Sequence, residues 1–296
     1  MIVLGPNQYG KAEVRLLRVN RSPGSHELRD LCVSVALSGD LEATHLTGDN
    51  SAVLTTDAQK NTVFAFAAEP GVGEIEDFAL LLARHFVATQ EAIHTARISI
   101  DEYAWERIAS TGHSFARSGR ETRTATVTCD GGEPRVTSGL RDLVLLNSAG
   151  SEFWGFARDQ YTTLAETTDR ILATAVNARW RHSWTPRYSE SYATARDLLM
   201  SAFAETRSYS LQQTLYAMGK RVLEGLPEVA EIHLSLPNKH HFEVDMSPFG
   251  IASKGEVFYA ADRPYGLIEG TVRRDDTIRP DDAARPDDEA GAGGPG

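Results

Sequence analysis

The sequence predicts an α+β fold made of two similar units, each with antiparallel strands and helices on one face of its sheet. Apolar residues alternate with a period of two in several stretches and change to helical spacing in others. The order strands, helices, strands then occurs twice along the 296 residues. The halves share no residue-level repeat, so element order alone indicates two units, expected at 8–138 and 139–274.

In the first half, strands are predicted at 11–20 and 31–38, paired as a hairpin-like unit, because residues 31, 33, 35 and 37 are apolar and share one face. An amphipathic helix is predicted over 74–89, where apolar side chains recur at near-helical spacing beneath a charged opposite face. The remaining strands and a Gly-rich turn of this half are expected at 96–101, 125–129 and 130–132.

The second half repeats that order. A strand is expected at 143–147, followed by a long segment over 161–181 and by helices at 192–204 and 211–223. Strands are expected again at 230–236, 240–246, 256–260 and 266–272. From residue 275 to 296 the chain is rich in Asp, Pro, Gly and Ala, so burial of apolar surface could not offset the entropy of ordering it, and a disordered acidic tail is predicted.

Charge and hydropathy exclude several classes of function. The formal net charge is −11, of which the tail carries a large share, and about −6 remains for the rest. An acidic surface repels phosphate backbones, so we expect no nucleic-acid partner, although a local basic pocket for one small anion is compatible with this charge. No run of 18 apolar residues occurs, so we expect no membrane span.

Cysteine content and the chain ends suggest a location. The two cysteines, Cys32 and Cys129, lie in alternating strand-like runs and are expected to be buried free thiols of a reducing compartment. The first residues are too polar for a signal peptide, and the last residues lack a peroxisomal signal of the Ser-Lys-Leu type. A bacterial cytoplasmic location is therefore expected.

Three segments concentrate polar groups at strand ends, namely 9–11, 48–62 and 237–241. Strand ends and loops on a rigid scaffold commonly present binding groups, so these segments are candidate site regions.

At these segments the chain resembles the urate oxidase family. The resemblance covers residues 8 to 273 and includes, in the family order, YGKAEVR, GDNSAVLTTDAQKNT, FWGFARDQYTTL, DRILAT, LQQTLYAMGK and LPNKHHFEVDMS. It implies two tandem T-fold domains per subunit and a homotetramer whose sheets close into barrels around a tunnel. It also implies active sites at subunit interfaces, and oxidation of urate by O2 and water to 5-hydroxyisourate and hydrogen peroxide, toward allantoin, without a metal or organic cofactor.

The resemblance also implies which residues bind the substrate. Arg170 matches the arginine that holds urate, an anion with carbonyl edges that suits a planar guanidinium. Gln212 matches the amide on the other edge, and Phe153 matches the ring that stacks on the purine. Leu211 and Thr56 match positions that contribute backbone N–H groups; the family often carries valine where this chain has Leu211. Without the family resemblance, Arg170 would be interpreted as part of a surface or interface salt bridge. Gln212 would be interpreted as a helix-surface amide, and Phe153 as a core side chain.

The catalytic residues are implied in the same way. Lys11 and Thr56 match a pair that relays a proton away from urate. A lysine accepts a proton only when it is neutral, so Lys11 should be sequestered from water, whereas most lysines are solvated. His240 matches the histidine that hydrogen-bonds Lys11, although the neighbouring His241 replaces what is often an aromatic residue in relatives.

Two further residues complete the predicted site. Asn238 matches the amide that, with the Thr56 hydroxyl, holds oxygen or a water over the purine plane. Asp57 is expected to cap the following helix and to orient the substrate-binding loop rather than to take protons itself.

Other classes of protein receive less support. The nine histidines and two cysteines show no CxxC, HxxxH or HExxH spacing, which argues against zinc and against a zinc-dependent T-fold cyclohydrolase. GxSxG and GxxxxGK[ST] motifs are also missing from the sequence. Two alternatives stay open: a purine-binding protein that has lost turnover, and a T-fold enzyme that acts on a pterin or a related ring.

Overall fold

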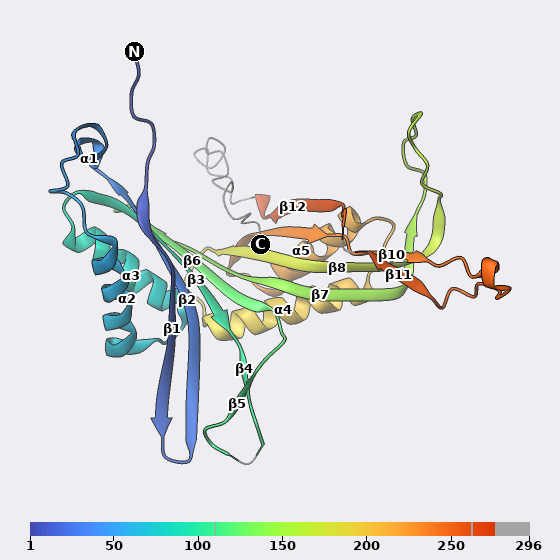
Figure 1. The fold of residues 1–296 in the computed structure, drawn as a ribbon, viewed down its shortest axis with the longest axis horizontal. Helices are drawn as coiled ribbons and strands as arrows, with labels where there is room; N and C mark the ends of the chain where they lie inside the picture. Colours follow the sequence, from blue (N-terminus) through green and yellow to red (C-terminus); the bar gives the residue numbers. More distant parts are fainter. Residues whose placement is uncertain (110, 262, 276–296) are drawn as a thin grey trace.

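The computed structural model describes residues 1–109, 111–261 and 263–275. The predicted tail therefore lies outside the described residues, except for its first residue. One antiparallel eight-stranded sheet forms the centre of the fold (Figure 1). Its strands, in spatial order, are β1 (Tyr9–Ser22), β2 (Ser25–Gly39), β3 (Ile93–Tyr103), β6 (Thr122–Cys129), β7 (Arg135–Phe153), β8 (Thr167–His182), β9 (Val229–Pro237) and β12 (Leu267–Arg273).

The first half of the sheet is covered by helices α2 (Thr56–Phe66) and α3 (Ile75–Thr89), joined by a short π-helical turn, η1 (Ala67–Gly71). A further short helix, α1 (Glu42–Thr47), follows β2. The predicted hairpin of β1 and β2 is confirmed, and the apolar face of β2 is buried. Helix α3 buries its predicted apolar face in the same core, with Phe78, Leu82 and Phe86 at most 2% exposed.

The second half has its own apolar core, which shares no residue with the first among the described residues. Helices α4 (Tyr188–Glu205) and α5 (Leu211–Gly225) pack together and against the sheet. Trp180 of β8 is fully buried in this core. The sequence predicts each half as strands, helices and strands, and the structure confirms this order as a mixed α and β architecture with antiparallel strands.

Several elements differ in extent from the predictions. Strand β7 is much longer than the predicted 143–147, because bulges interrupt the alternation that marks a strand in the sequence, and Asp142 adopts a φ of 63° at one of them. Helix α4 begins four residues before the predicted start. The strand expected at 240–246 ends at Glu243 as β10 (His240–Glu243), which pairs with β11 (Phe258–Ala261). The short strands β4 (Trp105–Arg107) and β5 (Phe115–Arg117) and a 3-10 turn, η2 (Ser247–Phe249), were not predicted.

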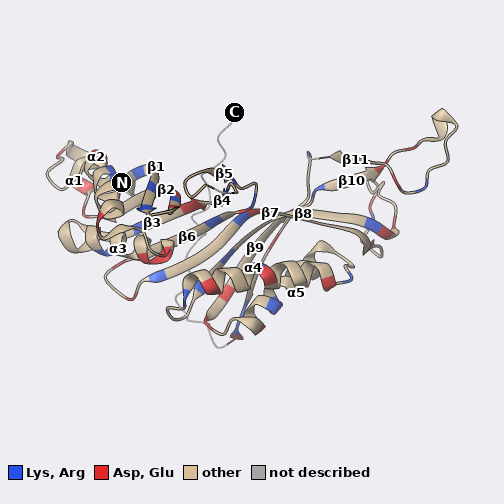
Figure 2. Ribbon diagram, turned by 90° about the horizontal axis from the view of Figure 1, so that it is seen from below, with Lys and Arg blue, Asp and Glu red and all other residues tan. Residues whose placement is uncertain are grey.

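The two faces of the sheet differ in chemistry. Helices α3, α4 and α5 lie on one face (Figure 2). The opposite face forms a polar hollow of about 1350 Å³. Its lining includes Ser34, Arg97, Ser99, Thr124, Thr126, Thr137, Asn177, Arg179, Arg181, His233, Ser235 and Thr271. Since residues of a strand alternate between faces, the same strands supply both the apolar core and this polar lining.

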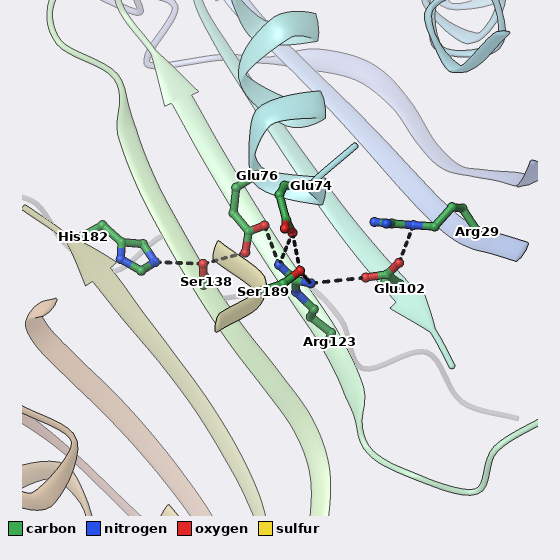
Figure 3. Close-up of polar contacts among 8 residues, drawn as sticks. All are labelled: Arg29, Glu74, Glu76, Glu102, Arg123, Ser138, His182 and Ser189. Atoms are coloured by element: carbon green, nitrogen blue, oxygen red, sulfur yellow. Dashed lines mark hydrogen bonds and ion pairs between the residues drawn. The ribbon is translucent and has the colours of Figure 1, made fainter. Parts of the chain in front are cut away.

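A buried polar cluster joins the two halves of the chain (Figure 3). Glu76, in the first turn of α3, is fully buried although that turn was expected to present its charges to solvent. Its carboxylate accepts hydrogen bonds from Arg123 Nη2 at 2.8 Å and from Ser138 Oγ at 2.6 Å. His182 Nε2 lies 2.9 Å from the same Ser138 hydroxyl. Strands β6, β7 and β8 are thus joined to the first turn of α3 through charged and polar groups, beside the apolar core that α3 shares with β6.

Burial changes the proton affinity of this cluster. It raises the pKa of Glu76, while the Arg123 charge acts in the opposite direction. It lowers the pKa of His182 from 6.5 to about 4, so this imidazole is neutral near pH 7. Because the Ser138 hydroxyl donates to Glu76, the His182 Nε2–H must donate to Ser138, and Nδ1 is left without a hydrogen-bond partner within the described structure.

Both cysteines are free, as predicted. Cys129 is buried, whereas Cys32 is only partly buried. Within the described ranges, none of the helices combines the length and apolar character that crossing a membrane requires.

Candidate functional site

The nine predicted site residues fall into two groups in the single chain. The first, called the Lys11 group, consists of Lys11, Thr56 and Asp57 on β1 and α2. The second, called the Arg170 group, consists of Phe153, Arg170, Leu211, Gln212, Asn238 and His240 on β7, β8, α5 and the segment from β9 to β10. Helix α2 and the β10–β11 pair lie at opposite ends of the molecule (Figure 1). One chain therefore does not bring all nine residues into one cavity, and none of the nine is among the described residues that line the polar hollow.

Two side chains fix the Lys11 group. The Tyr9 hydroxyl donates to the carbonyl oxygen of Leu54 at 3.1 Å, and the buried Gln59 amide donates to the same oxygen at 3.2 Å. Tyr9 precedes Lys11 by two residues, and Leu54 precedes Thr56 by two residues. These bonds therefore hold the start of β1 against the start of α2, and both Lys11 and Thr56 are partly buried there.

The backbone around Lys11 is unusual. A Cβ atom on Gly10 would lie 1.8 Å from the carbonyl oxygen of Val35, so only glycine allows this approach of β1 to β2. A bulge follows Lys11, where Glu13 has a φ of 55° and its N–H donates to Ser34 Oγ at 3.0 Å. The register on either side of Lys11 is thus set by a close contact and a bulge, which strand alternation alone does not reveal.

The predicted capping role of Asp57 is wrong. Thr55 is the N-cap of α2, and its hydroxyl accepts the backbone N–H of Ala58 at 3.1 Å. Asp57 is the second residue of the helix, two positions after Thr55, whereas a capping residue lies just outside the helix. Its carboxylate instead accepts hydrogen bonds from Lys60 Nζ at 2.5 Å and Asn61 Nδ2 at 3.0 Å. Lys60 lowers the pKa of Asp57, and Lys11 contributes to the same effect.

Arg170 and Phe153 form the centre of the second group. The guanidinium carbon of Arg170 lies 5.0 Å from the centroid of the Phe153 ring, within the range of a cation–π contact. Its Nε donates to Ser151 Oγ at 3.2 Å, and burial lowers the pKa of Arg170. The Phe153 ring also stacks on Phe156, with centroids 5.0 Å apart and an interplanar angle of 15°. The structure thus brings two of the predicted residues into contact.

The side chains of Leu211 and Gln212 have different surroundings at the start of helix α5. Ser210 is the N-cap, and its hydroxyl accepts the N–H of Gln213 at 3.1 Å. The Leu211 side chain is buried in the core, and the Gln212 side chain is exposed. Gln213, rather than Gln212, supports the turn by accepting the N–H of Tyr209 at 2.8 Å.

Leu211 and Thr56 share one structural property, because each is the first residue of its helix. The first N–H groups of an α-helix have no intrahelical acceptor, and the helix dipole adds positive potential at the same end. Helix N-termini therefore commonly bind anions. Both positions predicted to contact substrate through the backbone carry N–H groups of this kind.

Asn238 and His240 lie where β9 leads into β10. The Asn238 N–H donates to Gly266 O at 2.8 Å, so its backbone is fixed next to β12. His240 stacks on Phe242, with centroids 5.6 Å apart, so the two residues share one face as the alternation predicts. His241 Nδ1 lies 3.0 Å from the Lys239 carbonyl oxygen, whereas the His240 ring nitrogens make no hydrogen bond within the described chain. This difference favours His240 as the histidine available to a ligand.

Two residues next to the Arg170 group were not predicted. Glu152 is buried, and its carboxylate pairs with Arg207 in the loop before α5. The pairing joins residues 55 positions apart and follows no period or motif, so the sequence carries no signal for it. Across the described residues, His, Cys, Asp and Glu side chains form no group of three or more that could hold a metal ion.

Comparisons with known proteins agree on one family. A sequence model of the family described as Uricase matches residues 7–128 and 136–269. A uricase from Arthrobacter globiformis is 52% identical over 275 residues, covering 93% of this chain and 91% of its own length. A uricase from Dictyostelium discoideum is 40% identical, covering 93% of this chain and 98% of its own length. The crystal structure of the Arthrobacter globiformis uricase superposes with a TM-score of 0.91 at 51% identity, covering 94% of this chain and 97% of that structure.

Proposed function

The chain belongs to the uricase family, and we propose that its Lys11 group and its Arg170 group meet from two copies of the chain to form each urate-oxidising site. Oxidation of urate is its activity, an oxidoreductase reaction. The observation that carries the proposed site is the position of Thr56 and Leu211, which place two anion-attracting helix N-termini in the two groups.

The single chain offers surfaces for assembly. Strands β1 and β12 are the two edges of the sheet as far as the structure describes it, and unpaired edges can join neighbouring copies. Large apolar side chains are exposed around the β7–β8 loop and the β10–β11 pair, which is typical of protein contact surfaces. They include Trp154, Tyr161, Leu164, Phe242, Tyr259, Tyr265 and Leu267. These features support a homotetramer of two tandem T-fold domains per chain, at 8–138 and 139–274, with barrels closing around the polar face.

In this proposal the Arg170 group holds the substrate. The Arg170 guanidinium and the exposed Gln212 amide bind opposite edges of urate, and the Phe153 ring stacks on the purine plane. The N–H groups of Leu211 and Thr56 contribute further hydrogen bonds, with Asp57 next to Thr56 in the first turn of α2. The lowered pKa of Arg170 reflects burial and leaves the guanidinium charged, as recognition of an anion requires.

The Lys11 group handles protons. Thr56 passes a proton from bound urate toward the Lys11 amine, and His240 of the neighbouring copy hydrogen-bonds that amine. Lys11 is only partly buried in the single chain, so the proposal requires that assembly completes its separation from water. Asn238, together with the Thr56 hydroxyl, holds O2 or water over the purine.

The reaction balances without a resident cofactor, because urate itself is the reductant. Deprotonated urate gives one electron to O2, and the two radicals combine as a hydroperoxide at the ring carbon. Loss of peroxide and addition of water then convert urate, O2 and H2O to 5-hydroxyisourate and H2O2. The protein supplies position and proton transfer. A cytoplasmic location and the absence of nucleic-acid partners belong to the same proposal.

A direct assay tests this function. Purified protein is mixed with urate under air, and both the urate absorbance and the peroxide formed are measured, with and without a chelator. We expect equal amounts of urate consumed and peroxide formed, at a rate that the chelator does not change. Binding of urate without turnover would favour the purine-binding alternative. Loss of turnover in chelator would contradict independence from metal.

A further inference from the structure

We propose that the ion pair between Glu152 and Arg207 positions the substrate-binding groups and keeps a carboxylate charge from opposing an anionic substrate. The inference rests on the proposed function and assigns to its site two positioning residues, neither of which is expected to touch urate.

The Glu152 carboxylate is fully engaged. Its Oε1 accepts hydrogen bonds from Arg207 Nε, at 2.8 Å, and from Arg207 Nη2. Its Oε2 accepts the indole N–H of Trp154 at 2.8 Å. The Glu152 side chain is only 10% exposed, whereas that of Arg207 is 61% exposed. A nearly buried carboxylate therefore depends on one cation that reaches it from the surface.

The ion pair reinforces a backbone connection between two segments of the site. The Glu152 N–H donates to Ser208 O at 2.7 Å, and the Ser208 N–H donates to Gly150 O at 3.1 Å. The Ser208 hydroxyl accepts from Thr214 Oγ1 at 2.8 Å and donates to Ser210 O at 3.1 Å. The end of β7 is thereby linked to the N-terminus of α5, which carries Leu211 and Gln212.

Glu152 lies between two residues that contact Arg170. Ser151 accepts the hydrogen bond from Arg170 Nε, and the Phe153 ring lies beside the Arg170 guanidinium. A shift of Glu152 toward or away from Arg207 therefore moves both supports of Arg170 relative to Gln212.

Charge gives the pair its second role. Urate is an anion, so an uncompensated carboxylate one residue from Phe153 opposes its binding. Removing Arg207 alone leaves Glu152 with its charge and without its cation. Removing both charges leaves no carboxylate to oppose the substrate. R207Q and the double variant E152Q/R207Q therefore have different expected effects on urate binding.

The test compares R207Q, the double variant E152Q/R207Q and the conservative R207K in steady-state kinetics with urate. We expect R207Q to raise KM about tenfold with kcat changed less than about threefold, because binding rather than chemistry is affected. The double variant should restore KM to within about threefold of wild type, and R207K should lie between wild type and R207Q. The matched control is R187Q, which removes an exposed arginine paired with Glu190 at 3.0 Å and should leave KM unchanged.

Three results would overturn the inference. The first is an unchanged KM in R207Q, and the second is a KM in the double variant at least as high as in R207Q. The third is a change in kcat without a change in KM. The variant R170Q distinguishes failure of the ion pair proposal from failure of the proposed urate site. If R170Q raises KM and R207Q does not, only the ion pair proposal fails. If neither raises KM, the proposed site fails as well.

If the wild-type protein binds urate without turnover, equilibrium dialysis with urate compares the same variants by their affinity. Absence of urate binding by the wild-type protein would refute both proposals. Circular dichroism and elution volume of each variant detect misfolding, and the double variant tests the charge argument in a protein without a buried unpaired carboxylate.

Discussion

The Arg170 guanidinium lies beside the Phe153 ring, 5.0 Å from its centroid, although the two residues come from different strands. Strands β7 and β8 pair with Ser151 opposite Arg170 and Phe153 opposite Thr167. The register of this pair, with its bulges on either side of Ser151, therefore sets the distance between a cation and an aromatic platform. The proposed charge-recognising group and the proposed stacking group are thus in contact within one chain.

Replacing Arg170 tests its proposed role in binding. R170Q should lower kcat/KM for urate about 10- to 100-fold, because a hydrogen bond to a charged partner contributes about 1.5–3 kcal/mol. Arg158 provides a matched control, since its guanidinium lies 5.0 Å from the Phe156 ring but its side chain is half exposed and pairs with Glu166. R158Q should leave kcat/KM within about twofold of wild type. Equal losses of kcat/KM in R170Q and R158Q would contradict a specific role of Arg170 in urate binding.

Replacing Lys11 tests the proton relay. K11M should lower kcat about 10²- to 10⁴-fold with little change in KM, because a positioned general base contributes a factor of that size to the rate. K220M is the control, since Lys220 is exposed on α5 and pairs only loosely with Glu224, at 3.7 Å. Single-turnover measurements with urate separate proton transfer from binding. A K11M protein with the wild-type kcat would exclude Lys11 from the relay.

Periodic elements of this fold could be predicted from the sequence, and contacts between elements could not. The buried face of β2 and the apolar face of α3 follow from spacing alone. The first turn of α4 was missed because three of its four residues are polar, and its buried Ser191 is held by a hydrogen bond to Glu228 at 2.7 Å. Glu76 was expected on a charged solvent face, but it is buried because Arg123 and Ser138 come from strands distant in sequence.

The candidate site shows the same division. Short motifs placed Lys11, Arg170 and Gln212 through family resemblance, since each motif is local. The anchoring of Leu54 by Tyr9 and of Glu152 by Arg207 joins residues about 50 positions apart and leaves no local pattern. The capping role assigned to Asp57 was wrong by two positions because Thr55 and Asp57 are both good capping residues, and only the backbone at Thr55, with φ −57° and ψ 144°, decides between them.

The buried cluster at the junction predicts a large stability effect at Arg123. R123M should lower the free energy of unfolding by about 3–5 kcal/mol, because it leaves the buried Glu76 carboxylate without its cation. R141M should cost less than about 1 kcal/mol, since Arg141 pairs with Asp101 at 2.6 Å but is half exposed. Urea unfolding at one fixed protein concentration measures the free energy of unfolding of both variants. Similar costs for the two variants would contradict a buried role for Arg123.

His182 predicts a pH dependence of stability. Its folded-state pKa of about 4 lies below the ordinary 6.5, so the unfolded chain binds the proton first. Stability from this group is fully present above about pH 6.5 and falls as the pH drops toward 4, by up to about 3 kcal/mol. H182Q should flatten the loss measured in urea between pH 7 and 5.

Other groups near His182 also titrate, so the comparison with wild type isolates its contribution. Glu228 favours the protonated imidazole, and the raised pKa of Glu76 gives a component of opposite sign that both proteins keep. H94Q, which changes an exposed histidine next to Asp40, is the control. If the free energy of unfolding of H182Q depends on pH as steeply as that of wild type, the folded state does not lower the pKa of His182.

The separation of the Lys11 group from the Arg170 group within one chain has a genetic consequence. If each site takes one group from each of two copies, a chain defective in the first group and a chain defective in the second complement one another. Hybrid assemblies of K11M and R170Q then contain some sites built only from intact halves, about a quarter of the total when chains mix at random in pairs. Two impaired alleles expressed together would therefore give more activity than either gives alone.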